Sequence, residues 1–125
     1  PAGGLAIMVW SCGLDRPEPL ATPFMAAQAA AALDMPVKML FSSQSVQWLL
    51  AVNAERLTGF GPERWTIARH LDASVELGVE IRACTQALHA SGAHPGALAP
   101  QCAGVEGMVA FIEQGSAPGW QMLVF

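Results

Sequence analysis

The chain has 125 residues, a length typical of one domain and too short for two, so we expect a single domain over residues 1–125. Hydrophobic residues make up 53% of it and charged residues only 13%, a balance that favours burying further apolar surface in an oligomer. The net charge is −4, and the six Lys and Arg residues are scattered singly. No basic stripe is present to bind a phosphate backbone, which argues against a nucleic-acid partner.

Membrane insertion and secretion are also disfavoured by the sequence. Pro, Gly, Gln, Ser or Arg interrupts every apolar run before it reaches the ~18 residues of a membrane helix. The apolar start, residues 1–10, lacks the positive flank of a secretory signal, because the first basic residue is Arg16. We therefore expect no membrane association and a cytoplasmic location.

Short apolar runs alternate with helix-like segments from the beginning of the chain. Residues 5–10 (LAIMVW) are typical of a strand buried on both faces. After a proline-bearing loop, Thr22 can cap a helix with Pro23 at its first position, and the alanine-rich run extends this helix to Leu33. Residues 37–41 (VKMLF) predict a second strand.

The second half of the chain continues the same alternation. Ser45 can cap a short helix, and Pro62 predicts the start of a longer helix that reaches Leu77 and stops at Gly78. The elements expected after it are a strand over 79–83, a short helix over 85–91, an optional strand over 99–102, a helix over 105–114 and a strand over 121–125.

Strands separated by helices predict a parallel sheet with helices on both faces. We expect an α/β, three-layer, flavodoxin-like fold with a central, mostly parallel sheet. In the usual strand order 2-1-3-4-5, the first and third strands are neighbours, and a crevice opens beyond their carboxyl ends. Cys12 follows the first strand and Cys84 follows the third, so this order predicts both thiols at the crevice.

Cys84 is the main candidate for chemistry because it lies between a strand and the first turn of a helix. The free N–H groups of such a turn stabilise negative charge and lower a cysteine's pKa, and the thiolate is the nucleophilic form. The alternative is that Cys84 is a small buried apolar residue, a frequent fate of free cysteine. Cys12 is a possible second thiol, with packing at the strand end as its alternative.

Metal binding has little support in the sequence. Cys12, Cys84 and Cys102 are an odd number of cysteines without the spacing of a metal knuckle or a disulfide framework, so at least one thiol should be free. His89 and His94 flank the short helix after Cys84 and make a conceivable zinc or copper set with the cysteines. Their spacing matches no known metal motif, and we expect no metal.

The remaining polar candidates are weaker. His70 falls on the long helix and is expected to face solvent or an interface. Asp15 and Arg16 lie in the loop after the first strand, where a solvated pair or a contact to a polar substrate are both open. The loop SCGLDRPEP has a single glycine, which speaks against a nucleotide or flavin phosphate site, and we expect no cofactor.

The chain resembles the DsrE-like (DsrE/DsrF/TusD-like) sulfurtransferase and sulfur-carrier family over nearly its whole length. The resemblance lies in LAIMVWSCGLD, TPFMAAQAAAALDMPVKMLFSSQSVQWLL, ELGVEIRACTQALHASGAHPGAL and AGVEGMVAFIEQG. Its most specific part is a strand end of the form G-V-x-I-x-A-C followed by a short helix and a glycine, here residues 78–92. A fold of the DsrE-like type is therefore expected.

The resemblance also implies a function. It implies that Cys84 accepts a sulfane sulfur as a persulfide and passes it to a partner thiol, with a TusA-like carrier or a rhodanese-like donor as partner. It further implies homotrimers or hexamers and a role in sulfur trafficking or sulfur oxidation, as a sulfurtransferase-like carrier. Cys12 and Cys102 lie outside the matching motif.

Two other functions remain open at this point. One is a dithiol redox protein that forms a Cys12–Cys84 disulfide, which requires the two Cα atoms to lie within about 7 Å. The other is a non-catalytic, partner-binding subunit, which burial of Cys84 would favour.

Overall fold

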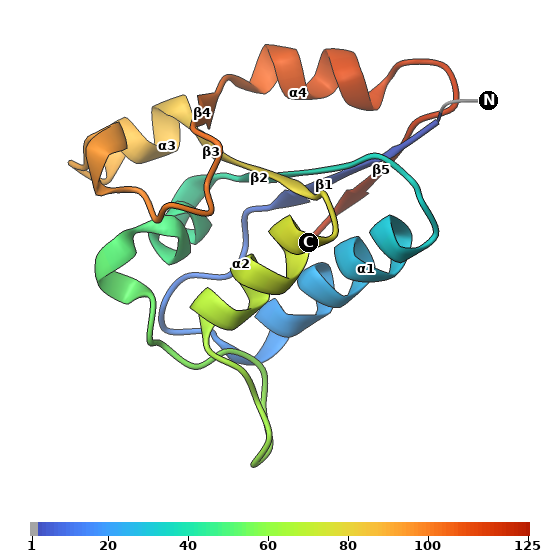
Figure 1. Ribbon diagram of the computed structural model, residues 1–125. Coiled ribbons are helices and arrows are strands. Elements are labelled where there is room, and N and C mark those ends of the chain that lie inside the picture. Colours follow the sequence, from blue (N-terminus) through green and yellow to red (C-terminus); the bar gives the residue numbers. More distant parts are fainter. Residues whose placement is uncertain (1–2) are drawn as a thin grey trace.

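A computed structural model describes residues 3–125 and shows one five-stranded parallel sheet with helices on both faces (Figure 1). The strands are β1 (Leu5–Val9), β2 (Val37–Phe41), β3 (Glu80–Cys84), β4 (Val105–Glu106) and β5 (Gln121–Val124). The α-helices are α1 (Ala21–Ala32), α2 (Ile67–Glu76), α3 (Thr85–Ala90) and α4 (Met108–Gly115). The short 3-10 helices are η1 (Glu18–Leu20), η2 (Ser43–Leu49), η3 (Ala51–Asn53) and η4 (Pro95–Ala97). The expected three-layer, DsrE-like fold is confirmed.

The strand order is β4-β3-β2-β1-β5, and the expected order 2-1-3-4-5 is wrong. β2 lies between β1 and β3. Successive strands are added on one side of β1 as far as β4, and β5 is then added on the other side of β1. Crossover connections between parallel strands are right-handed. α1 and α2 lie in connections that run across the sheet from β1 toward β3, whereas α4 lies in the connection that returns from β4 to β5. The same handedness therefore puts α4 on the opposite face from α1 and α2. Accordingly α1 and α2 cover one face and α4 the other (Figure 1).

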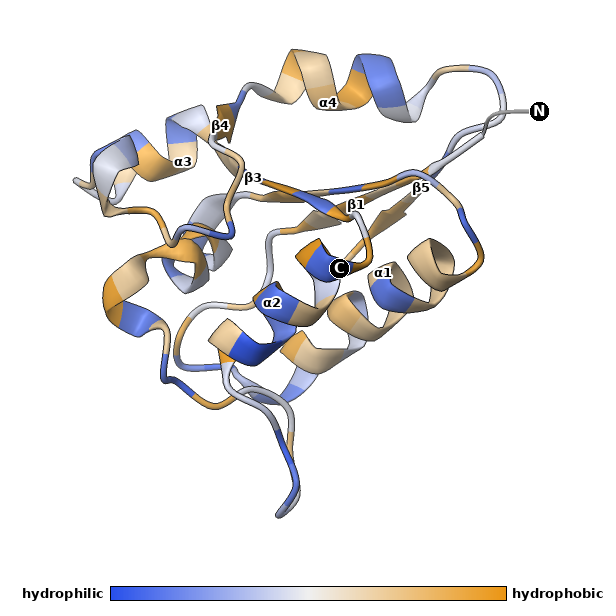
Figure 2. Cartoon of the chain, in the orientation of Figure 1, coloured by the Kyte–Doolittle hydropathy of each residue, from blue (hydrophilic) through white to orange (hydrophobic). Residues whose placement is uncertain are grey.

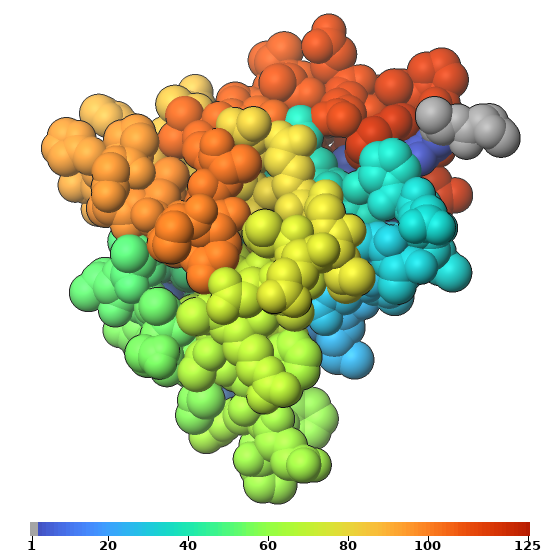
Figure 3. Space-filling model, in the orientation of Figure 1, coloured from blue at the N-terminus to red at the C-terminus, as the bar shows by residue number. Residues whose placement is uncertain are grey.

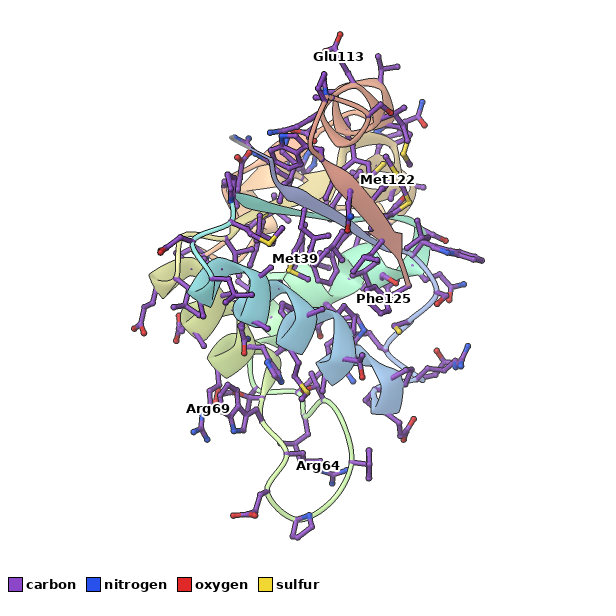
Figure 4. All side chains as sticks on the ribbon, turned by 90° about the vertical axis from the view of Figure 1, so that its right-hand side faces the viewer. Met39, Arg64, Arg69, Glu113, Met122 and Phe125 are labelled. Carbon is purple, nitrogen blue, oxygen red and sulfur yellow. The ribbon has the colours of Figure 1, made fainter. Side chains whose placement is uncertain are left out.

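Each face of the sheet has its own apolar core. The larger core, on the α1 and α2 side, includes Ile7, Met39 and Ile81 from the sheet. The smaller core, under α4, consists of Ala6, Leu40, Cys84 and Phe111, with partly buried neighbours that include Met122. Figure 4 shows Met39 and Met122 on opposite sides of the sheet. Alternate residues of the strands therefore supply the two cores, as the period of two requires.

The long helix begins later than the sequence suggested. α2 begins at Ile67, where Thr66 Oγ1 accepts a hydrogen bond from the N–H of Arg69 at 3.2 Å. A side-chain cap of this kind satisfies one of the free N–H groups of the first turn. The expected start at Pro62 is wrong, because that residue lies in a loop that projects from the body of the molecule (Figure 3). Gly78, with φ of 91°, ends the helix as expected.

Four smaller expectations are also corrected. α1 begins at Ala21 without a side-chain cap, so Thr22 is not its cap. Ser45 is buried within η2, where its hydroxyl oxygen accepts a hydrogen bond from the N–H of Cys12. Residues 99–102 form no strand, and residues 105–106 form β4 where a helix was expected to begin.

Apolar residues dominate the strands and α1, while the tip of the projecting loop is polar (Figure 2). None of the helices in the described part of the chain combines the length and the apolar character that crossing a bilayer requires.

Candidate functional site

Cys84 occupies the junction that the sequence predicted. It is the last residue of β3 and the N-cap of α3, with an extended backbone (φ −62°, ψ 124°). The apolar residues of β3 are all buried, whereas Glu80 and Arg82 are partly buried, and the chain turns into the helix directly after Cys84. The residue therefore lies at the carboxyl edge of the sheet, where parallel α/β folds place their sites.

The side chain of Cys84 is enclosed. It is only 4% exposed and belongs to the core under α4, with Leu40 and Phe111 as fully buried neighbours. Ala87, one turn further along α3, also packs against this core. In this conformation the sulfur has little direct access to solvent.

A hollow lies next to this junction, between η2 and α3. Its volume is about 230 Å³, and it is lined by Ser43, Gln44, Gln47, Ala87, Ala90 and Ser91. Ser43 holds a left-handed backbone conformation (φ 51°) directly after β2, which is uncommon for a residue with a side chain. The carboxyl ends of β2 and β3 thus open onto a hollow with polar walls on the η2 side and Ala87 on the side of Cys84.

A buried ion pair lies on the same face of the sheet as Cys84. Glu106 of β4 is the register partner of Cys84, and its Oε1 lies 2.7 Å from Nζ of Lys38 on β2. The two side chains are 8% and 12% exposed, respectively, and Glu106 Oε2 is buried without a hydrogen-bond partner among the described residues. Sequence reasoning missed this pair, although a lysine inside the apolar run VKMLF was a signal for it.

Cys12 lies elsewhere. It is 2% exposed and packs in the core on the α1 and α2 side, whereas Cys84 packs under α4. Its N–H donates to Ser45 Oγ at 2.9 Å, and its carbonyl accepts from Trp48 Nε1 at 3.0 Å. Burial raises the pKa of the Cys12 thiol, against the smaller opposing effects of Ser11 and Arg16. These features fit the structural alternative for Cys12.

The strand order also separates Cys12 from Cys84. Because β2 lies between their strands, the axes of β1 and β3 are about 10 Å apart, twice the spacing of neighbouring strands. All three cysteines are free thiols. The structure therefore does not bring Cys12 and Cys84 together in one crevice.

Cys102, His89 on α3 and His94 in the loop after it do not gather with Cys84 among the described residues. Cys102 is partly buried, its Sγ donates to the carbonyl of Gly104 at 3.5 Å, and burial raises the pKa of its thiol. His89 and His94 are exposed. Within residues 3–125 no three His, Cys, Asp or Glu side chains gather as metal ligands.

His70 is the residue whose environment the sequence predicted wrongly. It is buried, with 5% exposure, stacked on Phe24 at a ring-centroid distance of 5.0 Å. Burial, with a smaller effect from Arg69, lowers its pKa from 6.5 to about 4. Asp15 and Arg16 are exposed in their loop, as a solvated pair would be.

The fold is a three-layer α/β arrangement around a five-stranded parallel sheet, and it is shared with known structures. The structure of the chain is similar to that of YchN from Escherichia coli, with a TM-score of 0.72, 17% identity, and 98% of this chain and 99% of that chain covered. MTH1491, a protein of unknown function from Methanobacterium thermoautotrophicum, matches with a TM-score of 0.69 and 17% identity over 100% of both chains. BT1422, a conserved protein of unknown function from Bacteroides thetaiotaomicron, matches with a TM-score of 0.67 and 11% identity over 97% of this chain and 94% of that chain.

No protein-family model and no curated protein sequence matches the chain. At identities of 11–17%, the likeness to solved structures shows the fold alone.

Proposed function

We propose that the protein is a sulfur carrier that accepts a sulfane sulfur as a persulfide on Cys84 and passes it to a partner thiol. The observation that carries this proposal is the place of Cys84, which ends β3 and caps α3 beside the hollow at the carboxyl edge of the sheet. The resemblance of residues 78–92 to the sulfur-carrier motif supports the same residue.

The proposed reaction is an exchange between thiols. The Cys84 thiolate attacks the outer sulfur of a persulfide donor R–S–SH, a sulfur–sulfur bond to Cys84 forms, and the donor's sulfur–sulfur bond breaks. The proton lost by the Cys84 thiol ends on the leaving thiolate R–S⁻, so Cys84–SH and R–S–SH become Cys84–S–SH and R–SH. A second thiolate then takes the outer sulfur by the same reaction.

The burial of Cys84 makes access part of this mechanism. The hollow between η2 and α3 adjoins the core that holds Cys84, because Ala87 lines the hollow and packs against that core. A small shift of α3 would connect the two. The rate of loading should therefore follow opening of this helix as well as the thiolate fraction.

The test is the intact mass of the protein after brief exposure to inorganic polysulfide. We expect a gain of one or more sulfur atoms in the native chain, in Cys12→Ser and in Cys102→Ser, and no gain in Cys84→Ser with Cys102 also replaced by serine. Cys12→Ser is the matched control, because it removes an equally buried thiol on the other face of the sheet. Absence of any adduct, with Cys84 resisting alkylation in the folded protein, would overturn the proposal.

The burial of Cys84 favours a second candidate, a non-catalytic subunit that binds a partner. In that case the thiol packs as a small apolar side chain. The dithiol redox alternative has less support, because Cys12 and Cys84 belong to cores on opposite faces of the sheet.

The partners belong to the same proposal. A TusA-like carrier would receive the sulfur and a rhodanese-like protein would supply it. We also propose a homotrimer or hexamer, supported by the apolar side chains that the single chain leaves exposed on α4 and along the β5 edge, among them Val109 and Val124. Three free thiols fit a reducing compartment such as the cytoplasm.

A further inference from the structure

A second cavity, larger than the hollow beside Cys84, lies away from that residue. It occupies about 440 Å³ between the first half of α1, the loop before α2 and His70 of α2. This volume falls within the ~300–1,000 Å³ of small-molecule sites. None of the core residues around Cys84 lines it, and it lies on the α1 and α2 side of the sheet. Figure 4 shows Arg64 on the loop that closes it.

Gln28 and His70 give this cavity a polar part, where some of the hydrogen-bonding groups already have partners within the chain. Nε2 of Gln28 lies 3.3 Å from His70 Nδ1 and donates to Ser74 Oγ at 3.1 Å. With the His70 ring protonated on Nε2, its Nδ1 accepts from Gln28 and both amide hydrogens of Gln28 are engaged, while no described residue hydrogen-bonds Gln28 Oε1. Since Gln28 lines the cavity, a ligand that fills it is best matched by a group that donates a hydrogen bond.

The walls are apolar and partly aromatic. Trp65 lies 4.9 Å from the His70 ring between centroids, and the guanidinium of Arg69 lies 3.9 Å from the Trp65 ring centre, which holds that ring in place. Phe60 and Met25 also line the cavity, and they are 82% and 61% exposed. A flat apolar ligand would remove part of this surface from water, which is favourable by ~25 cal/mol per Å².

The charges around the cavity disfavour anions. Two carboxylates, Glu18 and Glu63, line it with one guanidinium, that of Arg64. The buried His70 adds no positive charge at neutral pH, because its pKa is lowered to about 4 by burial. A carboxylate or phosphate in the cavity would have to give up its water without a surplus of positive charge to replace it.

We propose that this cavity is a binding site for a small, uncharged, planar aromatic molecule that carries an N–H or O–H donor. The donor bonds to Gln28 Oε1, and the ring packs between Trp65 and the exposed side chains of Met25 and Phe60. The site is separate from the sulfur-carrier function and does not depend on it.

The test uses benzamide as a neutral probe and benzoate as its anionic counterpart of nearly the same shape. Each is titrated into the ¹⁵N-labelled full chain, and amide and indole shifts are followed by NMR. We expect saturable benzamide shifts at Thr58, Trp65 and Gln28, and at least tenfold weaker binding of benzoate. Cys84→Ser should bind benzamide as the native chain does, so the outcome is independent of the sulfur-carrier proposal.

Two variants on one helix separate binding in the cavity from binding elsewhere. Thr22 is exposed and lines the cavity, so Thr22→Trp should fill it and weaken benzamide binding at least tenfold. Ala29→Trp is the matched control, because Ala29 is exposed on α1 but does not line the cavity. Equal binding of benzoate, or benzamide shifts that survive Thr22→Trp, would overturn the proposal. So would loss of a native oligomer in Thr22→Trp, because a second copy would then occupy the cavity.

Discussion

At the scale of single residues, the burial of His70 makes the stability of the fold depend on pH. Its ring stacks on Phe24 and lies beside Trp65, and its Nδ1 faces the amide of Gln28. The sequence placed His70 on a helix correctly, but it could not show which face of that helix meets the core. A histidine is equally compatible with solvent and with an aromatic cluster, so its burial depends on contacts distant in the chain.

His70 should make stability depend on pH. Its pKa is about 4 when folded against 6.5 when unfolded, so between these values the unfolded chain binds more protons. The contribution of His70 to the free energy of unfolding should have its full value above pH 6.5. It should decrease as the pH falls toward 4, by at most about 1.4 kcal/mol per pH unit. Urea unfolding at pH 7 and pH 5 measures this loss, and His70→Gln should reduce it. An unchanged loss in the variant would show that other groups cause it.

At the scale of elements, the Lys38–Glu106 ion pair joins two strands that are not neighbours. Lys38 lies on β2 and Glu106 on β4, with β3 between them. The strand β4 has only two residues, so its ladder bonds alone fix it weakly. A charge pair that is almost fully buried helps to hold this edge of the sheet under α4.

Replacing one member of this ion pair should destabilise the protein more than replacing both. Lys38→Met leaves the Glu106 carboxylate buried without its cation, and we expect a loss of about 3–5 kcal/mol in the free energy of unfolding. The double variant Lys38→Met/Glu106→Leu should recover most of that loss, since it leaves no buried charge. Urea denaturation of the two variants makes the comparison. A double variant as unstable as the single one would contradict this account of the pair.

The elements also show how far sequence patterns reach. The runs at 5–10 and 37–41 predicted strands correctly, because parallel strands buried on both faces are continuously apolar. Strand order was not predictable in this way, since any neighbour satisfies an apolar strand. The error at Pro62 has a similar cause: a proline suits the first turn of a helix, but Thr66 provides the cap that fixes the actual start. For the candidate site, the junction at Cys84 was correct and its pairing with Cys12 was not.

At the scale of the whole molecule, β5 is an exposed edge of the sheet. Trp10, Leu123 and Val124 leave large parts of their side chains in water there, next to unpaired backbone groups. Edges of this kind are surfaces for association with another chain. The proposed homo-oligomer would cover them.

A charge on this edge should therefore change the size of the assembly. We expect Val124→Lys to shift the native oligomer toward monomer in sedimentation velocity, because a buried interface disfavours an unpaired ammonium. Val52→Lys is the control, since Val52 is the same residue type and is also exposed but lies on η3, away from the β5 edge. A native chain that sediments as a monomer at all concentrations would contradict the proposed assembly.

The position of β5 has a consequence for how the chain folds. β1 lies inside the sheet, but its partner β5 follows it by more than a hundred residues along the chain. Until residues 121–124 emerge, one side of β1 stays unpaired, and closing this contact requires a very long loop. The nascent chain thus carries an open, apolar strand edge while the residues between β1 and β5 are made, a stage at which such a protein is exposed to aggregation and to chaperones.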